Sequence, residues 1–224
     1  TSWNQLGGDI DGEAAGDRSG SGVSLSSDGN TVAIGAYMNS GNGSNAGHVR
    51  IYNYNGSAWI QLGGDIDGEA ADDQVGHYTS ISSNGSIVAI GAHLNDGNGS
   101  NSGHVRIYNY NGTSWNQVGN DIDGEAADDQ FGTEVSLSSD GNTVAIGAYL
   151  NDGNGSGSGH VRIYNYNGTS WNQLGNDIDG EASGDQSGGY VSLSSDGSIV
   201  AIGATGNDGN GSGSGHVRIY NYNG

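Results

Sequence analysis

The chain is a single unit of 56 residues repeated four times. Tryptophan returns at the same place in every unit, at Trp3, Trp59, Trp115 and Trp171, and the segment HVRIYNYNG occurs four times with the same spacing. Because 4 × 56 = 224, whole units account for the entire chain. A repeat of this size is usually one supersecondary unit that buries its faces only by stacking on its neighbours. We therefore expect one domain over 1–224, with repeats 1–56, 57–112, 113–168 and 169–224.

Each unit contains four short stretches with the alternation, or the β-branched and aromatic content, of strands. In the first unit these stretches are Val23–Ser26, Thr31–Ala36, His48–Tyr54 and Trp59–Leu62. Asp28-Gly29 and Asn55-Gly56 are typical two-residue hairpin turns, in which both central residues need positive φ. Longer loops, one rich in asparagine and glycine and one acidic, make the other connections. No stretch shows helical periodicity.

Four antiparallel strands per unit are typical of a β-propeller blade. We therefore predict an all-β propeller of four-stranded antiparallel blades. The chain opens on a fourth strand, Trp3–Leu6, and ends on a third strand, so the N-terminal strand is expected to complete the last blade and bring the termini together. A β-solenoid is the alternative, but its turns rarely carry such regular hairpins. Four blades can close alone, two chains can form a homodimeric eight-bladed ring, or further repeats can make a longer array.

The net charge of the chain limits the kinds of partner that it can bind. The chain has 25 acidic residues against five arginines, no lysine, and a net charge of -20. Such a surface repels nucleic acid and anionic lipid, and favours cations and basic partners. No apolar run approaches the roughly 20 residues of a membrane span, so no membrane insertion is expected. Cysteine is absent, which excludes disulfides and thiol chemistry. The first residue is Thr1 rather than methionine, and we expect a mature or excised piece.

Three strings of the third unit resemble a known family. They are Phe131 to Leu137, Val144 to Ala148 and Gly159 to Tyr164, and they resemble the FG-GAP blades of integrin α-subunit propellers and of bacterial secreted or surface proteins. The other units have Ser19-Gly20, Val75-Gly76 and Ser187-Gly188 in place of Phe-Gly. Ser-Ser-Asp-Gly and Val-Arg-Ile-Tyr also resemble WD-repeat blades. The resemblance implies a propeller used in adhesion or scaffolding outside the cell.

The acidic loop is the most repeated polar feature and a candidate calcium site. Calcium takes six to eight oxygen ligands, which carboxylates at alternate positions of a glycine-containing loop can supply. The candidate ligands are Asp9, Asp11, Glu13 and Asp17; Asp65, Asp67, Glu69 and Asp73; Asp121, Asp123, Glu125 and Asp129; and Asp177, Asp179, Glu181 and Asp185. The alternatives are that these acids are solvated, cap turns, or pair with the repeated arginines.

A second acidic pattern lies between the second and third strands, at Asp96, Asn98 and Ser100 and their copies. It again places side-chain oxygens at alternate positions, but a flexible hairpin loop is the favoured interpretation. Integrin-type blades hold calcium between their first two strands. The matching hairpin here, Ser27 to Asn30, offers too few ligands, so that site is not carried over.

Histidine recurs at His48, His104, His160 and His216. A single asymmetric catalytic site does not need four copies of one residue, so we expect these histidines to be structural. His77 and His93 occur once each and have no evident partner. No nucleophile motif is present, and we expect no enzymatic activity.

The aromatic residues are the remaining candidates. Trp3, Trp59, Trp115 and Trp171, with the repeated tyrosine pairs, could stack on sugars between blades, and repeated weak sites would gain avidity. Packing between blades is the favoured alternative. The sequence thus predicts a non-enzymatic secreted or cell-surface bacterial propeller for adhesion, protein binding or display. A multivalent lectin that binds a glycan ligand is the alternative function.

Overall fold

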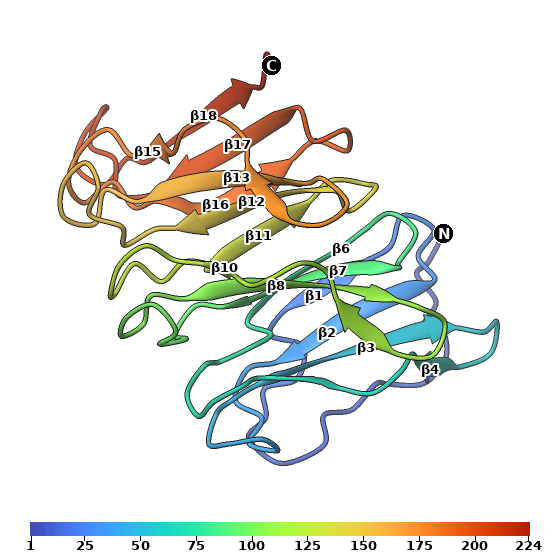
Figure 1. The fold of residues 1–224 in the computed structure, drawn as a ribbon. Coiled ribbons are helices and arrows are strands. Elements are labelled where there is room, and N and C mark those ends of the chain that lie inside the picture. Colours follow the sequence, from blue (N-terminus) through green and yellow to red (C-terminus); the bar gives the residue numbers. More distant parts are fainter.

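The computed structural model describes residues 1–224 and contains only strands and loops. The strands form four sheets that follow the four repeats and lie face to face in a row (Figure 1). The strands are β1 (Val23–Leu25), β2 (Thr31–Ala36), β3 (His48–Tyr54), β4 (Trp59–Gln61), β5 (Ile66–Asp67), β6 (Tyr78–Ile81), β7 (Ile87–Ala92), β8 (His104–Tyr110), β9 (Trp115–Gln117), β10 (Ile122–Asp123), β11 (Glu134–Leu137), β12 (Thr143–Ala148), β13 (His160–Tyr166), β14 (Trp171–Gln173), β15 (Ile178–Asp179), β16 (Ser187–Leu193), β17 (Ile199–Ala204) and β18 (His216–Asn221).

Each of the first three sheets has three antiparallel strands and an outer strand in two pieces. In the first sheet the order is β1-β2-β3, and both β4 and β5 pair with β3. The outer pieces follow each other along β3, since Tyr54 pairs with Trp59 at one end and His48 pairs with Asp67 at the other. The second piece lies within the acidic segment that the sequence predicted to be a loop. The fourth sheet has only β16, β17 and β18.

The core lies between the sheets. Ala33, Val49 and Ile51 of the first sheet pack against Ile81, Val88 and Ile90 of the second, and equivalent residues fill the next two junctions. Each sheet therefore presents one apolar face to the sheet before it and another to the sheet after it. A single unit could not bury both faces alone, which explains how a chain with 32% apolar residues still forms a core.

Glycine pairs bring neighbouring sheets into backbone contact. Gly91 at the end of β7 lies against Gly132, which precedes β11 in the next sheet. A Cβ added to Gly91 would overlap the carbonyl oxygen of Gly132, and the same holds for Gly35 against Gly76. No side chain fits at this approach. The contact occurs at all three junctions between sheets and explains why both glycines are kept there, although the residue before the second glycine varies.

The propeller-type fold is confirmed, and so are the expected strands, apart from the N-terminal one. The N-terminal strand differs from the prediction, because residues 1–22 contain no strand and the fourth sheet ends at β18. The physical reason is that this segment is held on the first blade. The carbonyl of Leu6 accepts a hydrogen bond from Trp59 Nε1 at 2.8 Å, and the carbonyl of Asp11 accepts one from Arg50 at 2.7 Å.

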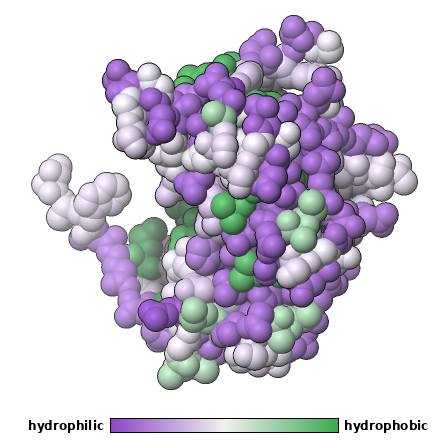
Figure 2. Space-filling model, turned by 90° about the vertical axis from the view of Figure 1, so that its left-hand side faces the viewer, coloured by the Kyte–Doolittle hydropathy of each residue, from purple (hydrophilic) through white to green (hydrophobic).

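The surface agrees with the composition. Figure 2 shows a largely hydrophilic face with small apolar areas between polar ones. The structure contains no helix that is long and apolar enough to cross a membrane.

The glycine contact gives the first prediction. Gly91→Ala should lower the free energy of unfolding by about 2–3 kcal/mol, as for an overpacked core, because two backbones must separate to admit the methyl group. Gly64→Ala is the matched control, since a Cβ there meets nothing within 4 Å and should change stability by less than about 0.5 kcal/mol. Urea denaturation of both variants measures the difference. Equal stabilities would contradict the close approach.

Candidate functional site

Each repeated histidine lies beside an arginine that joins neighbouring blades. In the third sheet His160 Nδ1 lies 3.8 Å from Asp177 Oδ2, and Arg162 Nε donates to Asp177 Oδ1 at 2.9 Å. Glu125, from the loop of the preceding blade, forms an ion pair with Arg162. His160 is almost completely buried. Burial, followed by the nearby charge of Arg162, lowers the pKa of His160, so the imidazole is neutral at pH 7 and the arginine carries the positive charge.

The same cluster occurs three times and includes a possible metal-ligand set. The acceptor atoms of Glu13, His48 and Asp65 lie within 4.8 Å of one another, as do those of Glu69, His104 and Asp121, and of Glu125, His160 and Asp177. Calcium prefers six to eight oxygen ligands, whereas each group offers one imidazole and two carboxylates. An arginine also pairs with the glutamate of each group. The residues therefore fit a blade-to-blade ion pair rather than a calcium site.

The four acids of each predicted calcium loop do not converge. In the third loop Asp121 lies near His104 of its own blade, Glu125 pairs with an arginine of the next blade, and Asp123 is exposed in β10. Asp129 is buried, where it accepts hydrogen bonds from Ala126 N and Asn151 Nδ2. The equivalent buried residues Asp17, Asp73 and Asp185 make the same kind of contacts. Calcium binding by these loops stays a prediction.

The side chains of the second acidic pattern make hydrogen bonds within and next to their own loop, between the second and third strands of the sheet. Asp152 Oδ1 accepts a hydrogen bond from Gly157 N at 2.7 Å, and Asn154 Nδ2 donates to the carbonyl of Gly180 in the next unit at 2.7 Å. The side chains that were candidate ligands therefore hold the hairpin in shape and attach it to its neighbour.

Three of the four tryptophans pack between blades. Trp59, Trp115 and Trp171 are half-buried, and each indole Nε1 donates at 2.8 Å to the carbonyl of Leu6, Leu62 or Val118 in the unit before. Their rings lie 5.1–5.3 Å from Tyr54, Tyr110 and Tyr166. Trp3, by contrast, is fully exposed. Sugar binding at these aromatic residues stays a prediction.

A different site emerges from the positions at which the units differ. One pair of adjacent positions reads Ser21-Gly22, His77-Tyr78, Thr133-Glu134 and Gly189-Tyr190, and a third position reads Tyr37, His93, Tyr149 and Thr205. The pair lies at or just before the start of the innermost strand in the second and third sheets, and the third position follows the end of the next strand. Since these two strands are antiparallel, both positions lie at the same end of every blade. The varied residues therefore share one inner face.

Two histidines meet on this inner face. The His77 ring lies 4.6 Å from Tyr37, 4.4 Å from Tyr78 and 5.5 Å from His93. The Nδ1 atoms of both histidines are buried without a hydrogen-bond partner. Burial, together with the neighbouring His77, lowers the pKa of His93 to about 4. Both imidazoles are therefore neutral at pH 7 and are part of an aromatic cluster.

Three tyrosines form a hollow beside this cluster. Tyr78, Tyr149 and Tyr190 line a cavity of about 250 Å³ together with polar groups of the third and fourth units. Glu134 lies close enough to Tyr78 for its charge to raise the tyrosine pKa, after the larger effect of burial. Burial also raises the pKa of Glu134 to about 7, although the nearby backbone N–H of Val135 opposes this rise. No cation in the protein pairs with this carboxyl.

We call this site the inner-face site, and it comprises His77, Tyr78, His93, Glu134, Tyr149 and Tyr190. The sequence pattern did not predict it. His77 and His93 were set aside because each occurs once and no partner stood near it in sequence. A comparison of the four units could have revealed the site, because residues that break a nearly perfect repeat are not needed for stacking. The varied residues lie close together because every unit places the same repeat position at the same end of its blade.

The arrangement of its sheets places the protein in the β-propeller class. Residues 122–164 match the model of the FG-GAP repeat, which confirms the resemblance seen in the sequence. Comparison with curated protein sequences gave no significant match.

Two solved structures align with this chain. Hydrazine synthase from Kuenenia stuttgartiensis aligns over 96% of this chain and 49% of its own, with a TM-score of 0.55 and 13% identity. A putative TolB from Agrobacterium tumefaciens aligns over 82% of this chain and 53% of its own, with a TM-score of 0.47 and 12% identity. The chain spans about half the length of these proteins. At such identity the first likeness shows the fold alone.

Glu134 gives a prediction about pH. Its folded pKa of about 7 exceeds the ordinary value of 4.5, so the native state binds this proton more tightly than the unfolded state. Stability therefore falls as pH rises from 4.5 to 7. Glu134→Gln removes this effect and should raise the free energy of unfolding at pH 8 by roughly 1–2 kcal/mol, allowing for partial solvent screening, with little change at pH 4. Thermal unfolding at both pH values tests it, and a loss of stability at pH 8 would contradict the unpaired carboxyl.

Proposed function

We propose that this chain is a non-enzymatic β-propeller binding module that recognises a cationic side chain of a protein partner at the inner-face site. The proposal places the module outside the cell or on its surface, in adhesion or display. The observation that carries it is the hollow lined by three tyrosines, with the unpaired carboxyl of Glu134 nearby in β11, among the few residues that the repeat does not require.

The chemistry of the site suits a cation. The faces of tyrosine rings attract ammonium and guanidinium groups within about 6 Å. Glu134 adds a negative charge in a half-buried place, where a charge pair is screened less than on the surface. Burial raises the pKa of this carboxyl, and an incoming cation would provide it with a charge partner. The net charge of -20 would also attract a basic protein over a longer range.

The contacts that the histidines make favour binding over catalysis. The repeated histidines contact carboxylates at the blade junctions, and His77 and His93 lie among aromatic rings. Neither of these two histidines has a hydroxyl nucleophile as a hydrogen-bond partner at Nδ1. The match to FG-GAP repeats supports a secreted or surface location, because such repeats are common in proteins of that kind.

The test is calorimetric titration with a Gly-Ser peptide that carries a single lysine or arginine. Affinity should rise from pH 6 to pH 8 as Glu134 loses its proton. Glu134→Gln should weaken binding about tenfold at pH 8, the equivalent of about 1.4 kcal/mol, and remove the pH dependence. Tyr190→Ala should also weaken binding without unfolding the chain, because its ring is largely exposed.

The control for general charge attraction is Asp123→Asn, which removes one exposed negative charge outside the site. It should leave the affinity within twofold. An equal loss of affinity in Asp123→Asn and Glu134→Gln would contradict the proposal. Binding of a neutral glycan that is retained in Glu134→Gln would instead support the lectin alternative.

A further inference from the structure

Two of the six histidines lie outside the repeat, and both belong to the second unit. The counterparts of His77 in the other units are serine, threonine and glycine, and those of His93 are tyrosine, tyrosine and threonine. His77 immediately precedes β6, and His93 immediately follows β7. Since β6 and β7 are antiparallel neighbours, the two side chains meet at one end of the blade. Histidine therefore occurs outside the repeat only at two positions that lie side by side.

Three buried polar atoms of the second unit lack a hydrogen-bond partner at positions where the units differ. They are His77 Nδ1, His93 Nδ1 and Oγ1 of Thr79, and Thr79 stands where the other units have valine. Native proteins contain few such groups, and a bound ion is one of the explanations for them. The stacking of blades does not require these residues, because the other units stack without them.

The protonation of both rings suits a metal ligand. Burial lowers the pKa of His77, and burial together with His77 lowers the pKa of His93 to about 4. Both imidazoles are therefore neutral at pH 7, and each has one nitrogen lone pair to offer. The repeated histidines differ, because each has a carboxylate oxygen 3.8 Å from Nδ1. At the junctions the positive charge that these carboxylates need already comes from an arginine.

The distance between the two rings fits a shared ion. Their centres are 5.5 Å apart, and their planes are inclined by 47°. An imidazole nitrogen lies about 2.0–2.1 Å from a bound Zn²⁺ ion, which places the ring centre about 3.2 Å from the ion. Two imidazoles at about 110–120° around one ion therefore have centres about 5–5.5 Å apart. Rotation of the two rings alone can thus bring a nitrogen of each onto the same ion.

We propose that His77 and His93 bind one transition-metal ion of the class that imidazole nitrogens prefer, such as Zn²⁺ or Cu²⁺. Imidazole suits zinc, copper and nickel, whereas calcium and magnesium prefer oxygen ligands. Both side chains are partly exposed on the inner face, so the ion can enter and keep water at its other coordination positions. The metal pair is therefore a different site from the predicted calcium loops. It also does not use Glu134, on which the proposed function rests.

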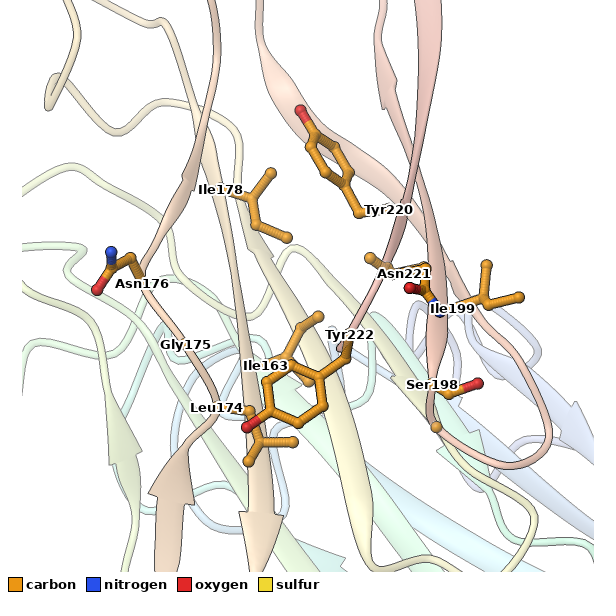
Figure 3. A pocket seen from close by; sticks show the side chains of 12 residues that line it. Ile163, Leu174, Gly175, Asn176, Ile178, Ser198, Ile199, Tyr220, Asn221 and Tyr222 are labelled. Atoms are coloured by element: carbon orange, nitrogen blue, oxygen red, sulfur yellow. The ribbon is translucent and has the colours of Figure 1, made fainter. Parts of the chain in front are cut away.

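The apolar pocket of the third and fourth sheets lacks this chemistry. It has a volume of about 180 Å³, and Ile163, Leu174 and Tyr222 are among the residues that line it (Figure 3). Its lining contains no histidine and no carboxylate, so it offers no ligand that a metal ion prefers.

The first experiment is a titration of the chain with Cu²⁺, followed by electron paramagnetic resonance. Because the net charge of -20 attracts divalent cations to many carboxylates, Mg²⁺ is present in excess to occupy the oxygen ligands. We expect one tightly bound Cu²⁺ ion per chain, with the hyperfine splitting of two coordinated nitrogens. Ni²⁺ and Zn²⁺ should bind at the same place more weakly than Cu²⁺, and Ca²⁺ should not compete.

The variants His77→Thr and His93→Tyr give the second unit the residues that the third unit has at these positions, so both should keep the fold. Each should weaken Cu²⁺ binding at least about tenfold, and the double variant at least about 100-fold, since losing even a supporting contact of a metal ligand costs about 10–100-fold in affinity. Asp123→Asn is the control for general charge attraction, because its carboxylate is exposed and lies outside the site. It should leave the affinity within twofold.

An unchanged affinity in the double variant would overturn the proposal, because the repeated histidines or surface carboxylates would then hold the ion. A spectrum with fewer than two coordinated nitrogens would overturn it as well. The metal titration contains no peptide, and the peptide titration of the proposed function can be run with a chelator. The failure of one proposal is therefore distinguishable from the failure of the other.

Discussion

The structure depends on one constraint, which is that every sheet has two apolar faces and can bury them only between two other sheets. The apolar residues of β2 and β3 are few, and they become a core only when the next blade covers them. Glycine pairs such as Gly91 and Gly132 let the inner strands approach closely enough for this packing. The polar contacts then follow from the stacking. The arginine of one blade reaches the glutamate of the blade before it, and each indole donates to the carbonyl of the preceding unit.

Much of the fold could be predicted because it is local. Thr31–Ala36 and His48–Tyr54 were predicted with the bounds of β2 and β3, since alternation and the Asp-Gly and Asn-Gly turns act within a few residues. The contact partners of the acidic side chains could not be predicted in the same way. Glu125 and Asp129 are close in sequence, but one contacts the next blade and the other contacts Asn151 across a buried loop. Those contacts depend on how blades are placed in space, and the sequence pattern within one loop holds no information on that.

The same reasoning separates the structural chemistry from the inner-face site. A residue that recurs at one position in four nearly identical units serves what the units have in common, which is stacking. His160 and Trp171 are of this kind. Tyr78, Glu134 and Tyr190 occupy one shared position where the first unit has Gly22, so the stack does not need a particular side chain there. Glu134 even reduces stability at neutral pH through its raised pKa. A costly residue at a position free to vary is expected if the position serves the proposed binding and not the fold.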